Sequence, residues 1–384
     1  MDRKDRLMSL DALRGFDMLW IMGGEGLVLA IATLCGCPDF YGKFDHVPWA
    51  GLQFMDTVFP TFLFMAGVSF PFSCAKSLER GLSRGQIASR ALRRGVTLML
   101  LGIVYWGFLK RLDFATFRIP SVLGYIGFGW MVAAWIFLFV RNVKVRIAIA
   151  VGILAAVTLF FGFVPAPDAA TVALPDWDWV QDRGPFSPAG NFGCWLDRTV
   201  LGPHALVRVC ADKHALFDNE GFAGLLPTVV TAMLGMFAGE IVRLGGLRPT
   251  GRKVLLLLIA AAICLASGLA LSTFCPIVKN LWSPSFVLVV GSYSFAMFAL
   301  FYWIIDVRRL TKWSFFFRVI GMNSITIYMA QRFISFGAIA SFFIGGFAGL
   351  LPTAWGKLVL ELGYIAACWL FLLFLYRKNV FLKV

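Results

Sequence analysis

Apolar stretches of about 20 residues recur along the whole chain, and a run of that length crosses the roughly 30 Å core of a bilayer as one helix. The composition agrees, because 59% of the 384 residues are hydrophobic and only 15% are charged, against about 25% charged in soluble domains. We therefore predict one all-α domain, residues 1–384, that forms a polytopic membrane protein. Its ten transmembrane helices are predicted at about 12–33, 52–74, 94–110, 120–140, 146–164, 223–243, 253–274, 285–306, 315–334 and 355–376. The short, glycine-rich apolar stretch 335–352 is interpreted as a re-entrant or interfacial segment.

The basic residues indicate how the chain is oriented. The net charge is +14, which suits either nucleic-acid binding or the excess of Lys and Arg on the cytoplasmic side of membrane proteins. With a cytoplasmic N-terminus, 24 of the 35 Lys and Arg residues fall in predicted cytoplasmic segments, which leaves 11 for the other side. Both termini are therefore predicted to be cytoplasmic, with no nucleic-acid partner. The one long hydrophilic loop, at about 165–222, is predicted to be ordered and extracytoplasmic.

The eight cysteines show no metal-ligand spacing, so no metal is predicted. Cys194 and Cys210 both fall in the predicted extracytoplasmic loop, a compartment in which a disulfide between them is allowed. Unpaired cysteines are an equal alternative, because the sequence does not give the connectivity.

A histidine, an acid and a proline interrupt the start of the second predicted helix, in FDHVPWAGLQFMDTVFPTFLF. Asp56 lies about one turn inside the helix, and Pro60, four residues later, removes the hydrogen bond that the Asp56 carbonyl would accept. His46 lies in the preceding loop. A lone loop histidine is more often a plain surface residue, but a carboxylate beside it fixes its tautomer and raises its basicity. We therefore predict that His46 and Asp56 are catalytic.

The first predicted helix also carries acids, which are costly in a bilayer and usually face a partner or a cavity. Asp17 is interpreted as pairing with basic residues that hold the helices together. Glu25 lies eight residues further on, which is about 12 Å along a helix. It is surrounded by Gly23, Gly24 and Gly26, which allow a ligand to approach closely. We predict a catalytic role for Glu25.

Two further segments place polar side chains toward the outer side of the membrane. The ninth predicted helix contains GMNSITIYMAQRF, and the loop before the eighth contains KNLWSPS. Hydrogen bonding between helices is an open alternative for Asn323 and Ser324. Because several segments converge at one depth, we predict that they bind the substrate. The predicted substrate-binding residues are Lys279, Asn280, Trp282, Asn323, Ser324, Tyr328 and Gln331.

Four segments are recognisable, namely RLMSLDALRGFDMLWIMGG, HVPWAGLQFMDTVFPTFLFMAGVSFPFS, NLWSPSFVLVVGSYSF and GMNSITIYM. Together they resemble the catalytic domain of the heparan-alpha-glucosaminide N-acetyltransferase family, and specifically a bacterial member. The resemblance implies a membrane-embedded enzyme that carries acetyl groups from cytoplasmic acetyl-CoA to the amine of a glucosamine-type sugar on the extracytoplasmic side. In this resemblance His46 matches the catalytic histidine and Asp56 the acid that follows it. Glu25 stands where the lysosomal enzyme has asparagine.

Under the resemblance, His46 acts as a general base or as an acetyl carrier, and both schemes stay open. Arg14, Arg94 and Arg318, at inner helix ends, are predicted to hold the phosphates of acetyl-CoA, with plain membrane orientation as the alternative reading of each. The expected setting is the cytoplasmic membrane of a bacterium, with the lipid bilayer as a partner and a homodimer allowed. The alternative functions are a transporter of a sugar or organic anion through the same polar centre, an O-acyltransferase and a structural scaffold.

Overall fold

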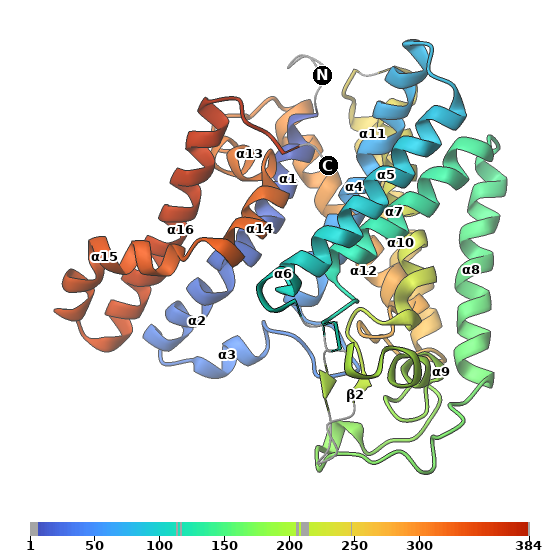
Figure 1. Ribbon diagram of the computed structural model, residues 1–384. Coiled ribbons are helices and arrows are strands. Elements are labelled where there is room, and N and C mark those ends of the chain that lie inside the picture. Colours follow the sequence, from blue (N-terminus) through green and yellow to red (C-terminus); the bar gives the residue numbers. More distant parts are fainter. Residues whose placement is uncertain are drawn as a thin grey trace.

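The structure is a computed structural model that describes residues 7–112, 114–115, 117–204, 207–208, 215–246 and 248–382. Helices make up almost all of the regular structure in this part of the chain (Figure 1). Two short strands, β1 (Val207–Arg208) and β2 (Ala215–Phe217), pair antiparallel in the long loop. The predicted all-α, multi-pass membrane fold is therefore confirmed.

Within the described residues, eight helical segments are long and apolar enough to cross a membrane. They are Met8–Leu34 (α1, Met8–Leu19; the π-helical η2, Trp20–Gly24; α2, Glu25–Leu34), Phe54–Glu79 (α4), Val122–Phe139 (α7), Val143–Phe163 (α8), Phe222–Arg243 (η6, Phe222–Gly224; α10, Leu225–Arg243), Gly251–Ser272 (α11), Pro284–Val307 (α12, Pro284–Phe301; the π-helical η7, Tyr302–Val307) and Thr353–Arg377 (α16). A ninth span is present if α14 (Ser324–Phe333) and α15 (Phe336–Gly349), which meet at a bend of 74°, are counted together. The predicted re-entrant or interfacial stretch 335–352 coincides with α15 and this bend.

Two of the ten predicted spans take a different form. The stretch predicted at 94–110 belongs to α5 (Arg84–Tyr105), whose arginine-rich first turns make it too polar to qualify as a span by composition. The stretch predicted at 315–334 divides into α13 (Phe315–Gly321) and α14, because the backbone leaves helical geometry at Asn323. The shorter elements are α3 (Pro38–Gly42), α6 (Phe108–Arg111), η3 (Asp178–Val180), α9 (Phe192–Leu196), η4 (Asp197–Leu201) and η5 (Gly202–His204).

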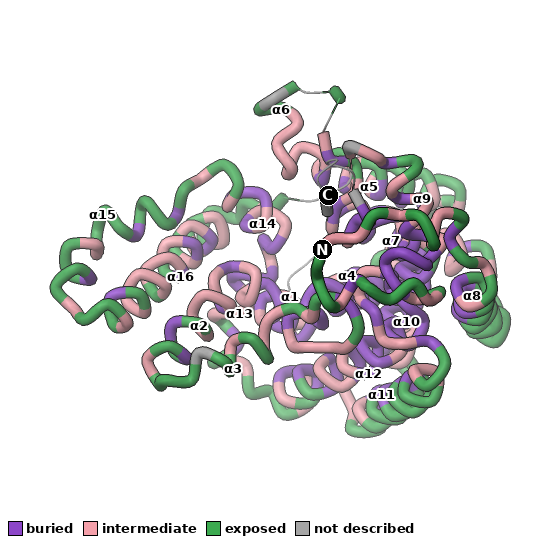
Figure 2. The backbone as a smooth tube through the Cα atoms, turned by 90° about the horizontal axis from the view of Figure 1, so that it is seen from below, coloured by how far each residue is buried: buried purple, intermediate pink, exposed green. Residues whose placement is uncertain are grey.

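The helices form two groups, seen from two directions in Figures 1 and 2. The first helical group consists of α1, α2 and α13 to α16, and the second consists of α4, α5, α7, α8 and α10 to α12. Helix α1 packs on α13 and also contacts α4 and α12, so it joins the two groups. A Cβ on Gly15 would lie 1.7 Å from the carbonyl oxygen of Phe317, and one on Gly321 would lie 1.8 Å from that of Asp11. Only glycine therefore allows α1 and α13 to pack this closely.

The first span is broken rather than continuous over the predicted 12–33. Gly23 has φ +114°, a left-handed conformation that glycine adopts without a steric penalty. The break lies inside the π-helical turn η2, and such turns are common at functional sites. The break makes Glu25 the first residue of α2.

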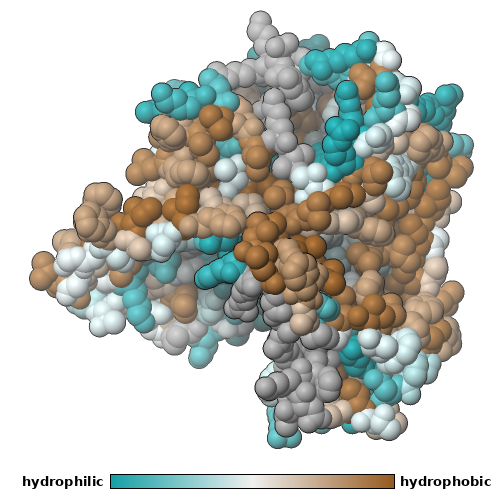
Figure 3. All heavy atoms as spheres, in the orientation of Figure 1, coloured by the Kyte–Doolittle hydropathy of each residue, from teal (hydrophilic) through white to brown (hydrophobic). Residues whose placement is uncertain are grey.

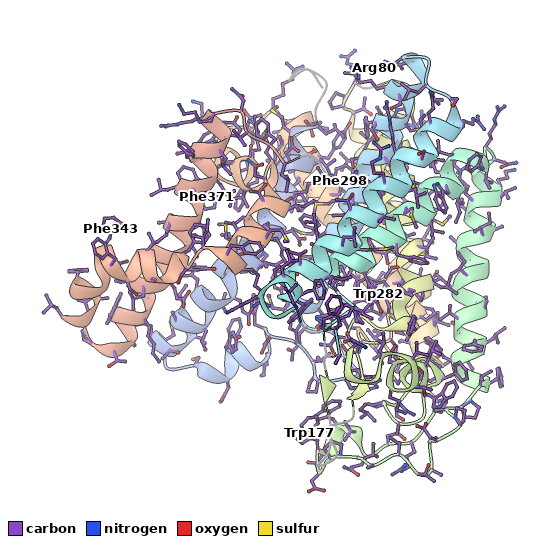
Figure 4. The ribbon with its side chains drawn as sticks, viewed as in Figure 1. Arg80, Trp177, Trp282, Phe298, Phe343 and Phe371 are labelled. Carbon is purple, nitrogen blue, oxygen red and sulfur yellow. The ribbon has the colours of Figure 1, made fainter. Side chains whose placement is uncertain are left out.

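The hydrophilic segments lie at opposite ends of the helices. Arg80, between α4 and α5, marks one end, and Trp177, in the loop after α8, marks the other (Figure 4). The start of α1 and the end of α16 lie at the Arg80 end (Figure 1). Apolar side chains cover much of the surface between the two ends (Figure 3), as contact with lipid requires. The segments predicted to be cytoplasmic thus lie opposite the long loop, while the direction of insertion stays a prediction.

The long loop after α8 is ordered around one buried arginine. The Arg198 guanidinium donates to both carboxylate oxygens of Asp168 and to three backbone carbonyls. Cys194 is buried in the same loop, and burial raises the pKa of its thiol well above the usual value. Cys210, the other half of the disulfide considered from the sequence, lies outside the described residues.

Candidate functional site

Asp56 lies in the first turn of α4, and its side chain is fully buried. Its Oδ1 is 2.7 Å from Nδ1 of His46 and 3.2 Å from Nζ of Lys279. Its Oδ2 accepts the backbone N–H groups of Val47, at 3.3 Å, and Gln53, at 3.1 Å. Four donors therefore surround this carboxylate, and they offset the cost of burying its charge.

The contacts of His46 indicate which ring nitrogen is free. A carboxylate only accepts hydrogen bonds, so the short contact with Asp56 requires the imidazole hydrogen to be on Nδ1. That nitrogen then cannot also accept from Lys279, which is 2.9 Å away, so the ammonium donates to Asp56 instead. Nε2 keeps its lone pair, and the His46 side chain is 47% exposed. This arrangement suits a general base or a nucleophile that a substrate can reach.

Two loops are joined to bring these groups into contact. Ala50 and Val278 pair in an isolated antiparallel bridge, and the Asn280 side-chain amide donates to the Pro48 carbonyl at 3.3 Å. These contacts hold Lys279 over Asp56. Asn280, predicted to bind substrate, is thus at the edge of the site, with its amide engaged by the neighbouring loop.

Trp282, also predicted to bind substrate, lies three residues after Lys279 and is buried. Its side chain is 1% exposed and packs edge-on against the rings of Phe59 and Tyr125. Its Nε1–H donates to Oγ1 of Thr231 at 3.0 Å. Because its polar atom and its surface are used inside the protein, Trp282 supports the Lys279 loop and is not placed to touch a ligand.

Glu25 is connected to the His46 segment through Tyr41 rather than directly. The Tyr41 hydroxyl donates to Oε1 of Glu25 at 2.6 Å, and this hydrogen bond, together with burial, raises the pKa of Tyr41. Tyr41 lies on α3, which leads into the His46 loop, and its carbonyl accepts the backbone N–H of Asp45 at 3.0 Å. Glu25 is therefore placed to hold this loop, and its catalytic role stays a prediction.

Asn323 does not converge with His46 as the sequence led us to expect, and the Gln331 amide is bonded within the first helical group. The Asn323 amide donates at 3.0 Å to the carbonyl of Val380, just beyond α16 and so at the Arg80 end of the molecule. His46 lies before the start of α4, at the opposite end of the molecule. Asn323 and His46 therefore do not share the depth that was expected from the sequence. Gln331 donates to the Tyr364 hydroxyl at 2.6 Å, which joins α14 to α16. Both amides therefore donate hydrogen bonds that join segments of the first helical group.

Ser324 and Tyr328 line a cavity of about 30 Å³ between the two helical groups. Phe59, one turn after Asp56 on α4, is part of the same wall. The Tyr328 ring also stacks on that of Tyr105, with 4.4 Å between the ring centroids. These two predicted substrate residues thus lie behind the His46 site, along the junction between the helical groups.

Two of the three arginines predicted to hold phosphates lie together. Arg14 donates to Oγ of Ser69 on α4 at 3.2 Å. The Arg94 guanidinium lies 4.3 Å from the ring centroid of Trp130 and is close enough to Arg14 for the two charges to repel each other. Nη1 of Arg14 also lies 4.0 Å from Oδ1 of Asp11, so a carboxylate balances part of this positive charge. Arg318 lies on α13, directly after Phe317, whose carbonyl packs against Gly15 of α1.

An ion-pair cluster that the sequence did not lead us to expect lies next to Lys279. Arg118 donates to both carboxylate oxygens of Asp218, at 2.6 and 3.2 Å, and also to Glu220. Burial raises the pKa of Glu220, and the charge of Arg118 opposes this rise. Burial lowers the pKa of Lys279, and the charges of Asp56 and Glu220 oppose that change. The available signal was the acidic run DNE at 218–220, which falls inside the stretch assigned to a loop.

No protein-family model matches the chain. Heparan-alpha-glucosaminide N-acetyltransferase of Homo sapiens is 27% identical to it over 99% of its length, and the enzyme of the same name from Mus musculus is 27% identical over 85%. The chain spans 60% and 53% of the lengths of these two curated relatives. The structure and the comparisons together thus describe a multi-pass membrane protein that is distantly related to heparan-alpha-glucosaminide N-acetyltransferases.

Proposed function

We propose that the chain is a transmembrane N-acetyltransferase with acetyl-CoA as donor and the amine of a glucosamine-type sugar as acceptor. The observation that carries the proposal is the exposed His46 imidazole on the buried Asp56 carboxylate, with Lys279 beside it. The names of the two relatives support it, because both are N-acetyltransferases of a glucosaminide. A bacterial cytoplasmic membrane and a homodimer remain expectations from the resemblance.

In the direct scheme, the sugar amine attacks the thioester carbonyl carbon while Nε2 of His46 takes a proton from the amine. The C–N bond forms, the C–S bond breaks, and the departing CoA thiolate takes the proton back from the imidazolium. Amines of this kind, with a pKa near 8, are largely protonated at neutral pH, so a base is useful. Asp56 acts through His46 as a positioning residue, because it holds the Nδ1–H tautomer and stabilises the imidazolium.

The two-step scheme uses the same residues. Nε2 of His46 attacks the thioester carbonyl carbon, the C–S bond breaks and the CoA thiolate leaves. The amine then attacks the acetyl carbon, the C–Nε2 bond breaks, and the proton that the amine loses goes to the released Nε2 or to the CoA thiolate. In both schemes negative charge develops on the carbonyl oxygen, and we assign its stabilisation to the Lys279 ammonium, which lies 2.9 Å from Nδ1 of His46. A preorganised donor of this kind typically contributes about 3 kcal/mol to transition-state stabilisation.

We place the phosphates of acetyl-CoA at Arg14 and Arg94. Ser69, which accepts from Arg14, lies 13 residues after Asp56 on α4, so the two positions are about 20 Å apart along the helix. The donor therefore needs a long arm to bring its thioester to His46, and acetyl-CoA has one. The small cavity beside Ser324 and Tyr328 lies at the junction that such an arm would follow.

The decisive experiment gives the purified protein acetyl-CoA and a panel of amino sugars, and measures acetylated sugar and free CoA by mass spectrometry. His46→Ala should reduce sugar acetylation by about 10²–10⁴-fold. The matched control is His204→Ala, because His204 lies in the long loop and its ring contacts the Phe117 carbonyl instead of the Asp56 carboxylate. Equal acetylation by the His46 variant and the wild type would refute the assignment. Movement of sugar across vesicles without acetylation would favour the transporter.

A further inference from the structure

A large apolar groove lies between α8, α10, α11 and α12, away from the His46 site. Its volume is about 820 Å³, within the range of roughly 300–1,000 Å³ that is typical of small-molecule sites. Ala155 and Ser267 are among its lining residues, and Figure 1 shows α8 at the edge of the molecule beside these helices. Val151 on α8 and Ile263 on α11, which also line it, are each 60% exposed. Since all four helices are candidate membrane spans, the groove opens toward lipid.

One end of the groove is closed by a charged pair. Arg146 lies one helical turn before Ala150, a lining residue of α8, and Glu240 lies about one turn after Phe237, a lining residue of α10. Nη2 of Arg146 donates to Oε1 of Glu240 at 2.8 Å. The groove itself is lined almost entirely by apolar side chains, and this charged pair lies next to one of its ends.

The charged pair leaves donors and an acceptor unused. Arg146 is 6% exposed, yet its Nε and Nη1 have no hydrogen-bond partner among the described residues. Oε2 of Glu240 is buried without a partner as well. Unpartnered polar atoms at a buried position are costly, so this pair is suited to a ligand that supplies one acceptor and one donor.

We propose that the groove binds a phospholipid with a primary ammonium headgroup, of the phosphatidylethanolamine type. The acyl chains lie along the apolar part, the phosphate accepts from Arg146, and the ammonium donates to Glu240. Exposed Arg141 and Lys144 lie at the same end of α8, where basic residues near the membrane surface attract lipid phosphates. A quaternary ammonium headgroup has no N–H to give Glu240, and a glycerol headgroup has no positive charge.

The groove itself is tested by a pair of adjacent substitutions. Ala155→Trp fills the cavity, whereas Ala156→Trp places the same side chain on an exposed position of α8 that does not line it. Phospholipid that stays with the detergent-purified protein is measured by mass spectrometry after extraction. We expect the Ala155 variant to lose most of the bound phospholipid and the Ala156 variant to keep the wild-type amount. Equal retention in the two variants would overturn the lipid site.

The headgroup is tested separately with Glu240→Gln, which keeps the shape of the side chain and removes its charge. Delipidated wild-type protein and the variant are titrated with phosphatidylethanolamine, phosphatidylcholine or phosphatidylglycerol, and the apparent affinity is taken from thermal stabilisation. Wild type should bind phosphatidylethanolamine about tenfold more tightly than phosphatidylcholine, and the variant should lose this difference. Equal binding of the three lipids by the wild type would refute the roles of Arg146 and Glu240.

Discussion

Asp56 and Asp17 are both buried in candidate membrane spans, but their surroundings differ. The Asp56 carboxylate receives four donors, from two side chains and two backbone N–H groups. Asp17, on α1, is 3% exposed, and its Oδ2 has no hydrogen-bond partner among the described residues. The basic partner expected for Asp17 is therefore missing at that oxygen. Burial of an acid is therefore by itself weak evidence of a catalytic role. A full set of hydrogen-bond donors around the carboxylate is stronger evidence, because it keeps the buried group ionised.

The largest effect should come from making the same substitution at both aspartates. Asp56→Asn leaves the shape intact but can place a donor against Nδ1 of His46, which shifts the imidazole hydrogen to Nε2 and removes the free base. We expect kcat/KM for sugar acetylation to fall about 10²–10⁴-fold. Asp17→Asn should keep activity within about twofold of wild type. A matching loss in the Asp17 variant would break the comparison.

Lys279 gives the next largest effect, because it contacts the same Asp56 oxygen as His46. Lys279→Gln removes the ammonium that faces the developing oxyanion, so kcat should fall by about 10²-fold. Lys43→Gln is the matched control on an exposed lysine and should keep the wild-type kcat. A kcat within about twofold of the wild type for Lys279→Gln would refute this role of Lys279.

The helical spans and the His46–Asp56 contact could be predicted because both depend on residues near each other in the sequence. Spans follow from composition over about 20 residues. His46 and Asp56 are only ten positions apart in the sequence, so their contact is local. The break inside η2 was harder to foresee, because glycine is also compatible with a continuous helix and the sequence does not show the left-handed backbone of Gly23.

Contacts between distant segments could not be predicted in the same way. Arg118 and Asp218 are 100 residues apart, and no periodicity connects them. Asn323 was assigned a depth from a continuous ninth helix, but the helix breaks at that residue and its amide faces the segment after α16. The contacts of Trp282 with Phe59, Tyr125 and Thr231 likewise depend on three helices meeting.

Arg94 and Arg318 allow a smaller test at the proposed phosphate end. The charge of Arg14 reaches Arg94, on α5, whereas Arg318 lies on α13. Loss of one charge-assisted hydrogen bond typically costs about tenfold in affinity, so Arg94→Gln should raise the KM for acetyl-CoA by about that factor with kcat little changed. Arg318→Gln should have a smaller effect. Equal increases in KM for the two variants would restore the three-arginine prediction.

Asp197 is a third buried acid and should give the smallest effect, on stability alone. Its two oxygens accept the backbone N–H groups of Asp218, at 3.3 Å, and Phe222, at 2.7 Å, but burial outweighs these bonds and raises its pKa to about 7. A carboxyl whose pKa is higher in the folded than in the unfolded protein stabilises the fold most below about pH 4, and this contribution is lost as the pH rises through 7.

Asp197→Asn keeps an amide that stays neutral across this range, so its melting temperature should fall less between pH 4.5 and 7.5 than that of the wild type, by a difference of about a few degrees. Asp182→Asn, in an exposed turn of the same loop, is the control and should follow the wild type. Asp197 lacks the two side-chain donors that surround Asp56. We therefore expect the negative charge of Asp197 to destabilise the loop, whereas the charge of Asp56 is stabilised and positions His46. Parallel melting curves for wild type and the Asp197 variant over this pH range would show that backbone donors alone are enough to hold a buried carboxylate ionised.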